Sequence, residues 1–335
     1  MALRLPGFTR ASSLGPIHTF VEEGGGSIAR VLSAVDLPFA ILEQREIIVP
    51  LREQFRLLDR AARETGDPYF GARLGQVVKS MELSAFGAWV CAASTLQQAT
   101  WRAQVGMGAL LQTSTPLTLS VCGPIARWSI EFLEPESEGR HHNEFLALGY
   151  MIDVVRVYAG PAWRPNVVMS ALPRGTPICE LEEIFGANIS HGHAVPAIEF
   201  CASLLANRSF ACRFERQLRA SATEPSVPRP TDVAAATASV VELALHDGYP
   251  RMDWVASKLG TTRRSLQRWL KEEGTTFNRV AEEILLRRAE RLLRESRAPV
   301  TDIALTLGYG DPAHFTRAFR RWTGVSPSQY RQRIG

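Results

Sequence analysis

Residues 308–331, GYGDPAHFTRAFRRWTGVSPSQYR, join a glycine turn to a basic amphipathic helix. Asp311 is suited to cap a helix whose first residue is Pro312, because the N–H that proline lacks would have no partner there. The helical period places Phe315, Phe319 and Trp322 on the inner face. It places Ala313, Thr316, Arg317 and Arg320 on the outer face. Together with the short apolar helix expected before Gly308, this pattern predicts a helix-turn-helix unit.

A second unit of the same kind lies upstream, in residues 252–274, MDWVASKLGTTRRSLQRWLKEEG. Gly260 permits the turn, and Thr261 or Thr262 can cap the helix that follows. In that helix Leu266 and Leu270 face inward. The other face carries Arg264, Gln267, Arg268 and Lys271. Arginine can bind guanine through O6 and N7, and glutamine can bind adenine through N6 and N7, so this face predicts contact with a DNA major groove.

Residues 275–296, TTFNRVAEEILLRRAERLLRES, predict one continuous helix between the two units. A helix of about twenty residues spans about 30 Å. Successive major grooves on one side of B-DNA lie about 34 Å apart. We therefore expect the two recognition helices to enter adjacent major grooves.

Charge and proline content divide the chain. Residues 232–335 hold 17 Lys and Arg against 12 Asp and Glu, a net charge of +5, whereas the rest of the chain has a net charge of −1. This asymmetry is typical of a polyanion-binding module joined to a neutral domain. The stretch SATEPSVPRP, residues 221–230, contains three prolines and predicts a linker. We expect a regulatory domain in residues 1–220, a linker in 221–231 and a DNA-binding domain in 232–335.

The region before the linker predicts an α+β domain. Residues 17–110 are mainly helical by their apolar spacing. Two strand-like runs follow, PLTLSVCG and ARWSIEFLE, then a helix in 142–159 and a further strand-like run, NVVMSAL. No glycine-rich phosphate loop follows a strand, which favours an antiparallel sheet over a crossover α/β fold. The expected fold is helices plus an antiparallel sheet, followed by an all-α domain.

Two long segments resemble the AraC/XylS family of bacterial transcription regulators. They are LGTTRRSLQRWLKEEG and APVTDIALTLGYGDPAHFTRAFRRWTGVSPSQYR. The resemblance implies that the first recognition helix contacts DNA through Arg264, Gln267 and Arg268. It implies that the second does so through Pro312, Ala313, Thr316 and Arg317. It also implies a structural role for Gly324, Pro327 and Tyr330.

The upstream region resembles the arabinose-binding-type regulatory domain of a subset of these regulators. The resemblance rests on AARETGDPYFGARLG, AASTLQQATWRAQ, AGPAWRPNVVMSALP and EIFGANISHGHAVPAIEF. It implies a small-molecule sensor that dimerises, without identifying arabinose as the effector. The helical content before residue 110 differs from the cupin-like barrel of the founding sugar sensor.

The predicted sites follow from these two halves. The DNA-binding candidates are Arg263, Arg264, Gln267, Arg268, Lys271, Pro312, Ala313, Thr316, Arg317 and Arg320. The candidates for an apolar effector pocket with an arginine anchor are Phe86, Trp89, Trp101, Arg102, Arg127, Trp128 and Tyr150. A plain core role is the alternative for each member of the second set.

Neither a metal site nor a catalytic site is predicted. His141 with His142, and His191 with His193, lack a third ligand at convincing spacing. The five cysteines are Cys91, Cys122, Cys179, Cys201 and Cys212, and no CxxC pair occurs among them. No nucleophile elbow is present, and no cofactor is expected.

These features predict a non-enzymatic, cytoplasmic regulator, since the chain shows neither a secretory leader nor a run of about 18 apolar residues. Its expected partners are promoter DNA, an unidentified small-molecule effector, RNA polymerase and a second copy of the chain, and activation is the expected output. One alternative is a constitutively DNA-bound protein whose large domain only oligomerises. Another is a DNA-repair enzyme carrying this module, a class that needs a metal-coordinated cysteine cluster.

Overall fold

The structure is a computed structural model that describes residues 5–209 and 226–334. The chain divides into two compact units. One spans Pro6–Val227, and the other contains the described residues from Pro228 onward. The division falls within the stretch predicted as a linker, of which residues 221–225 lie outside the described residues.

The N-terminal unit contains a five-stranded sheet of order β3-β4-β7-β5-β6. Its strands are β3 (Leu117–Cys122), β4 (Ile125–Ile130), β5 (Val167–Met169), β6 (Asn188–Ser190) and β7 (Ala197–Cys201). The predicted antiparallel pairing is confirmed except for β5 and β6, which pair in parallel. Helix α9 (Cys179–Phe185) connects these two strands, and a crossover of this kind is what parallel neighbours require. A separate antiparallel pair joins β1 (Phe8–Arg10) to β2 (Ile48–Pro50).

Helices make up most of the remaining N-terminal unit, as predicted. They are α1 (Ile17–Glu23), α2 (Ile28–Val35), α3 (Ala40–Glu43), α4 (Leu51–Thr65), α5 (Phe70–Val77), α6 (Ser84–Cys91), α7 (Leu96–Gly106) and α8 (Arg140–Ala159). Short 3-10 segments occur at η1 (Ala11–Leu14), η2 (Ser80–Glu82) and η4 (Ala202–Ala206), and η3 (Met107–Leu111) is π-helical.

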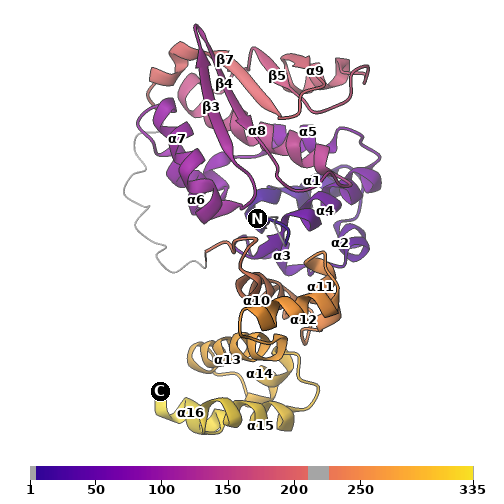
Figure 1. The fold of residues 1–335 in the computed structure, drawn as a ribbon, viewed down its shortest axis with the longest axis vertical. Helices are drawn as coiled ribbons and strands as arrows, with labels where there is room; N and C mark the ends of the chain where they lie inside the picture. Colours follow the sequence, from indigo (N-terminus) through magenta and orange to yellow (C-terminus); the bar gives the residue numbers. More distant parts are fainter. Residues whose placement is uncertain (1–4, 210–225, 335) are drawn as a thin grey trace. The chain divides into compact units, whose positions relative to one another are not determined.

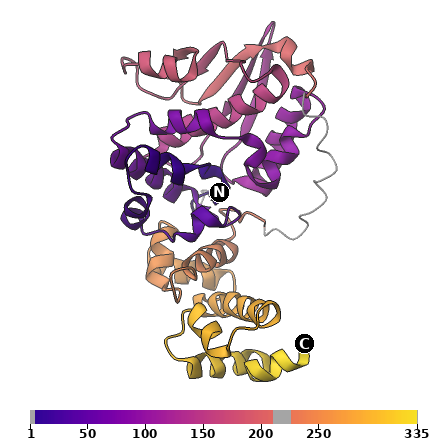
Figure 2. The same cartoon turned by 180° about the vertical axis from the view of Figure 1, so that it is seen from behind.

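Helix α8 forms the centre of this unit, because buried side chains surround it on nearly all sides. In both views α5 and α8 lie beneath the larger sheet (Figures 1 and 2). Their backbones meet at Gly75 and Gly149. A Cβ atom added to Gly149 would lie 2.3 Å from the Gly75 carbonyl oxygen, so the close approach of the two helices requires glycine.

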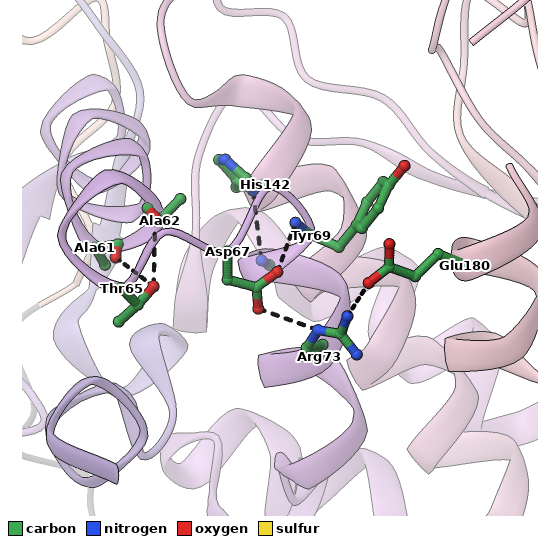
Figure 3. A network of polar contacts seen from close by, with 9 residues as sticks. Ala61, Ala62, Thr65, Asp67, Tyr69, Arg73, His142 and Glu180 are labelled. Atoms are coloured by element: carbon green, nitrogen blue, oxygen red, sulfur yellow. Dashed lines mark hydrogen bonds and ion pairs between the residues drawn. The ribbon is translucent and has the colours of Figure 1, made fainter. Parts of the chain in front are cut away.

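A polar network fixes the N-terminal end of α5 (Figure 3). The Arg73 guanidinium lies 3.2 Å from an Asp67 carboxylate oxygen and also pairs with Glu180 of α9. The Gly71 backbone N–H donates to Nδ1 of His142 over 3.4 Å. Burial lowers the pKa of His142 to about 3, so the imidazole is neutral and its nitrogen can accept. The network joins α5 to both α8 and α9.

The C-terminal unit is all-α, as predicted. Its helices are α10 (Val233–Ala244), α11 (Met252–Lys258), α12 (Arg263–Glu272), α13 (Phe277–Glu295), α14 (Val300–Thr306), α15 (Pro312–Thr323) and α16 (Pro327–Ile334). The pairs α11–α12 and α14–α15 are the two helix-turn-helix units, and α13 joins them (Figure 1). None of the helices in the described ranges is both long and apolar enough to cross a membrane.

Both helix-turn-helix units turn at a glycine with positive φ, 65° at Gly260 and 79° at Gly308. At Gly308 the surroundings also exclude a side chain, since an added Cβ would lie 2.2 Å from the backbone nitrogen of Tyr249. The turn itself therefore packs against the segment that precedes α11.

Candidate DNA-binding surface and ligand cavity

Helix α12 begins at a threonine cap and buries one leucine stripe. The Thr262 side chain accepts a hydrogen bond from the Ser265 backbone N–H over 3.2 Å, which identifies which of the two candidate threonines is the cap. Leu266 and Leu270 are fully buried. The burial of these leucines fixes which side of the helix faces solvent.

The outer face of α12 presents five exposed polar side chains: Arg263, Arg264, Gln267, Arg268 and Lys271. Arg263 lies 3.7 Å from Asp253 and Arg268 lies 3.9 Å from Glu272, and both pairs are exposed. Exposed pairs at such distances contribute little, so DNA phosphates can displace them. Arg264 and Lys271 have no ion-pair partner among the described residues.

Helix α15 begins as its sequence predicts. The Asp311 side chain accepts from the Ala313 backbone N–H over 2.8 Å, and Pro312 occupies the first helical position. Phe315 and Phe319 are fully buried. The Phe319 ring also stacks edge-on against Tyr330 of α16 at 5.4 Å, which gives the aromatic residue of the closing segment a packing role.

The outer face of α15 differs chemically from that of α12. Ala313, Arg317 and Arg320 are exposed, but Thr316 is half-buried and its hydroxyl donates to the Pro312 carbonyl over 3.0 Å. Arg317 and Arg320 have no ion-pair partner in the part of the chain that the structure describes. Arg321, in contrast, pairs with Glu282 of α13 and so holds α15 against the connector.

A cavity lies inside the N-terminal unit, between α6, α7, α8 and the β3–β4 face of the larger sheet. The cavity has a volume of about 70 Å³, counted as the space open to the centre of a water molecule. Since one water needs about 10–15 Å³ on that measure, the space is that of about five waters. The lining residues are Ser13, Gln54, Ser80, Leu83, Phe86, Gly87, Val90, Ala103, Met107, Leu111, Gln112, Leu117, Trp128, Ile130, Phe132, Asn143, Leu146, Ala147, Tyr150, Met151 and Val154.

Three of the seven predicted ligand-binding residues line this cavity, namely Phe86, Trp128 and Tyr150. The other four do not: Trp89, Trp101, Arg102 and Arg127. Trp101 is 57% exposed.

Contacts outside the cavity engage the two predicted anchor arginines. Arg102 donates to the Trp89 carbonyl over 2.7 Å and lies over the Trp89 ring. Arg127 pairs with Glu199 at 2.6 Å. Neither guanidinium is placed to hold an acid in the cavity.

The polar part of the cavity wall was not anticipated. Ser13 donates to the Gln54 side-chain oxygen over 2.6 Å, and Gln54 donates to the Asn143 side-chain oxygen over 2.7 Å. These residues come from η1, α4 and α8. No sequence pattern links them, because only the tertiary fold brings such distant segments together.

The described residues include no cluster of side chains suited to holding a metal ion, and their cysteines form no disulfide. No group of three or more His, Cys, Asp or Glu side chains there could hold a metal ion. The four described cysteines are free. Burial raises the pKa of Cys91 to about 12, which disfavours its thiolate. Cys212 lies outside the described residues.

Comparison with known proteins identifies both units. Residues 255–333 match a helix-turn-helix domain family, and residues 25–209 match the family described as the arabinose-binding domain of AraC transcription regulator, N-terminal.

Three regulators illustrate the similarity. The transcriptional regulator VirS of Mycobacterium tuberculosis is 26% identical over 337 residues, covering 98% of each chain. The ornithine utilization regulator of Pseudomonas aeruginosa is 41% identical over 90 residues, covering 27% of this chain and 26% of that protein. The transcriptional activator RhaS of Escherichia coli is 42% identical over 81 residues, covering 24% of this chain and 29% of that protein. The regulatory-domain match alone spans more than half of the chain, which therefore belongs to the AraC-type transcription regulators with an arabinose-binding-type N-terminal domain.

Proposed function

We propose that the chain is a promoter-binding regulator whose two recognition helices, α12 and α15, enter adjacent major grooves. The supporting observation is the outer face of α12, where exposed Gln267 stands between Arg264 and Arg268 while the leucines behind it are buried. Helix α13 has 19 residues and so spans about 28 Å, close to the separation of successive grooves.

The two helices divide the task of recognition in this proposal. Helix α12 reads bases through Arg264, Gln267 and Arg268, with Arg263 and Lys271 on phosphates. Helix α15 docks by shape, with Pro312 and Ala313 close to the groove floor and Arg317 and Arg320 on phosphates. The methyl group of Ala313 is suited to contact with a thymine methyl.

Control by a small-molecule effector is the second part of the proposal. The effector binds the N-terminal domain and favours one DNA-binding state of a homodimer, to the extent of its differential affinity for the two states. Activation is the proposed output, through contact with RNA polymerase in the cytoplasm. One of the relatives, 42% identical over 81 residues, is named as an activator. No enzymatic step is involved.

The first test is selection of DNA sequences from a random pool by the full-length chain, followed by footprinting of the selected site. Two protected segments, one helical turn apart, are the expected result. A single protected segment that is unaffected by substitutions in α15 would contradict the two-groove arrangement.

A second test separates effector control from constitutive binding. Affinity for the selected site and sedimentation of the full-length chain are measured with and without a panel of small molecules. A compound that binds saturably and changes either property supports sensing. If every compound that binds leaves both the affinity and the dimer state unchanged, the constitutive alternative holds.

A further inference from the structure

Apolar side chains line the cavity along α8 and the sheet. Leu146, Tyr150, Met151 and Val154 lie along one side of α8, and Trp128 of β4 stands across from them with its neighbours Leu117 and Ile130. Such a wall favours a ligand that buries apolar surface, at about 25 cal/mol for each Å² removed from water.

Trp128 carries a hydrogen-bond donor without an acceptor. The side chain is 1% exposed, and its indole N–H has no partner among the described residues. A buried donor left without a partner costs about 1–3 kcal/mol. Trp128 is one of the residues that line the cavity, so a ligand that displaces the side chains beside this ring can bring an acceptor to the N–H.

Other polar side chains in the wall each have at least one protein partner. Ser13, Gln54 and Asn143 form the hydrogen-bonded chain described above. The Ser80 hydroxyl donates to the Tyr150 carbonyl over 2.8 Å, and the Gln112 amide donates to Thr115 over 2.7 Å. A sugar would bring several hydroxyl groups that find few free partners, and each unpaired one would be costly.

Among the residues that the structure describes, no lysine, arginine, histidine, aspartate or glutamate lines the cavity. An ionised carboxylate or amine buried there would lose its hydration without gaining an opposite charge. The wall thus discriminates against charged ligands as well as against polyhydroxylated ones.

Part of the wall is adaptable in shape. Met107 and Leu111 come from the π-helical segment η3, a backbone form that is rare and often found at functional sites. Met107 and Met151 are flexible side chains that can repack around different ligand outlines. The site can therefore accommodate a molecule somewhat larger than the space left between the side chains.

We propose that this cavity is the effector site and that it takes a small, uncharged, mainly apolar molecule with one hydrogen-bond acceptor, such as a ketone, ether or alcohol oxygen, directed at the indole N–H of Trp128. This inference rests on the proposed effector control and names its ligand class.

The test uses the full-length chain with nitrogen-15 in its tryptophan indoles and four probes. Cyclohexanone has the ring and the acceptor, cyclohexene has the ring alone, cyclohexanecarboxylate adds a charge, and L-arabinose represents a sugar. We expect cyclohexanone to shift the Trp128 indole resonance saturably and to raise the melting temperature, and the charged and sugar probes to do neither.

Two variants and one control locate the site. Trp128→Phe removes the donor and should weaken cyclohexanone about three- to tenfold, the worth of one net hydrogen bond, while leaving cyclohexene unchanged. Ala147→Leu fills the space from α8 and should abolish binding of both probes even if Trp128→Phe folds poorly. Trp101→Phe changes an exposed tryptophan and should have no effect.

Three outcomes would overturn the inference. They are the absence of any shift with the neutral probes, equal cyclohexanone affinity in Trp128→Phe, and a Trp128 shift with cyclohexanecarboxylate or arabinose. Site selection on DNA does not depend on these probes. A regulator that binds its selected site and responds to a charged effector elsewhere would keep the proposed function and refute only this ligand class.

Discussion

Gln267→Ala and Thr316→Val are predicted to affect DNA binding unequally, although both residues hold outer positions of recognition helices. The Gln267 amide is exposed, so it is free for a base edge. The Thr316 hydroxyl is already bound to the Pro312 carbonyl at 3.0 Å, and valine keeps its shape. The substitution at Gln267 therefore removes a potential DNA contact, whereas the one at Thr316 removes an internal bond.

The magnitudes follow from these contacts. Loss of a bidentate base contact by Gln267 should cost about 1–3 kcal/mol, a factor of about 5 to 150 in dissociation constant, and relax preference at one base step. Thr316→Val should change affinity by less than about twofold, since the hydroxyl makes no DNA contact in this arrangement.

Fluorescence anisotropy on the selected site, repeated at several salt concentrations and with each base varied, measures both effects. Lys271→Ala serves as the comparison. Lys271 contacts a phosphate in the proposed arrangement, so its loss should weaken binding evenly for all sequences and lower the salt slope by about 1. The division of labour between α12 and α15 is wrong if Thr316→Val abolishes sequence preference while Gln267→Ala leaves it intact.

Three further predictions concern stability. Asp311→Ala should lower it by about 1 kcal/mol by removing the α15 cap, whereas Asp311→Asn, which can still accept from Ala313, should not; thermal denaturation of the two variants decides this. Phe319→Ala should lower the free energy of unfolding by about 3–5 kcal/mol, because the ring is fully buried. Urea titration followed by the helical circular dichroism signal measures this change, and an unchanged midpoint would contradict the prediction. Burial lowers the pKa of His142 to about 3, so below about pH 6.5 the unfolded chain takes up a proton that the folded chain does not. Stability should then fall with decreasing pH by up to about 1.4 kcal/mol per unit, and His142→Gln should flatten the profile measured by urea titration from pH 7 to 5.

The C-terminal fold could be predicted closely because its signals are local. Asp311 and Pro312 define the start of α15 within two residues, and glycines with positive φ terminate the preceding helices. Helical period then assigns Phe315 and Phe319 to the core. Each of these features depends on residues a few positions apart, so the sequence alone carries it.

The N-terminal sheet was only partly predictable. The runs that form β3 and β4 alternate and are joined by a tight turn, which is a local signal. The parallel pairing of β5 with β6 depends on the crossover through α9, and β6 has only three residues. A strand that short, paired with one distant in the chain, has too weak a pattern to be recognised.

The residues that line the cavity were harder still to predict, for a physical reason. Aromatic type selected Phe86, Trp128 and Tyr150, but it also selected Trp101, which points to solvent. An arginine anchor was expected, yet Arg127 is held by Glu199 across the β4–β7 pair. Residue type reports what a side chain can do, whereas the partner that satisfies it depends on the tertiary fold.

The two helix-turn-helix units share a packing pattern but differ on their outer faces. Their buried stripes are under the same packing constraint, and both keep large apolar side chains at i and i+4, Leu266 with Leu270 and Phe315 with Phe319. Their outer faces carry no packing constraint, so an exposed amide can remain in α12 while α15 has Ala313 at its start. A sequence period therefore predicts that both helices exist, whereas the proposed division into a base-reading helix and a helix that docks by shape rests on the hydrogen-bonding state of each exposed side chain.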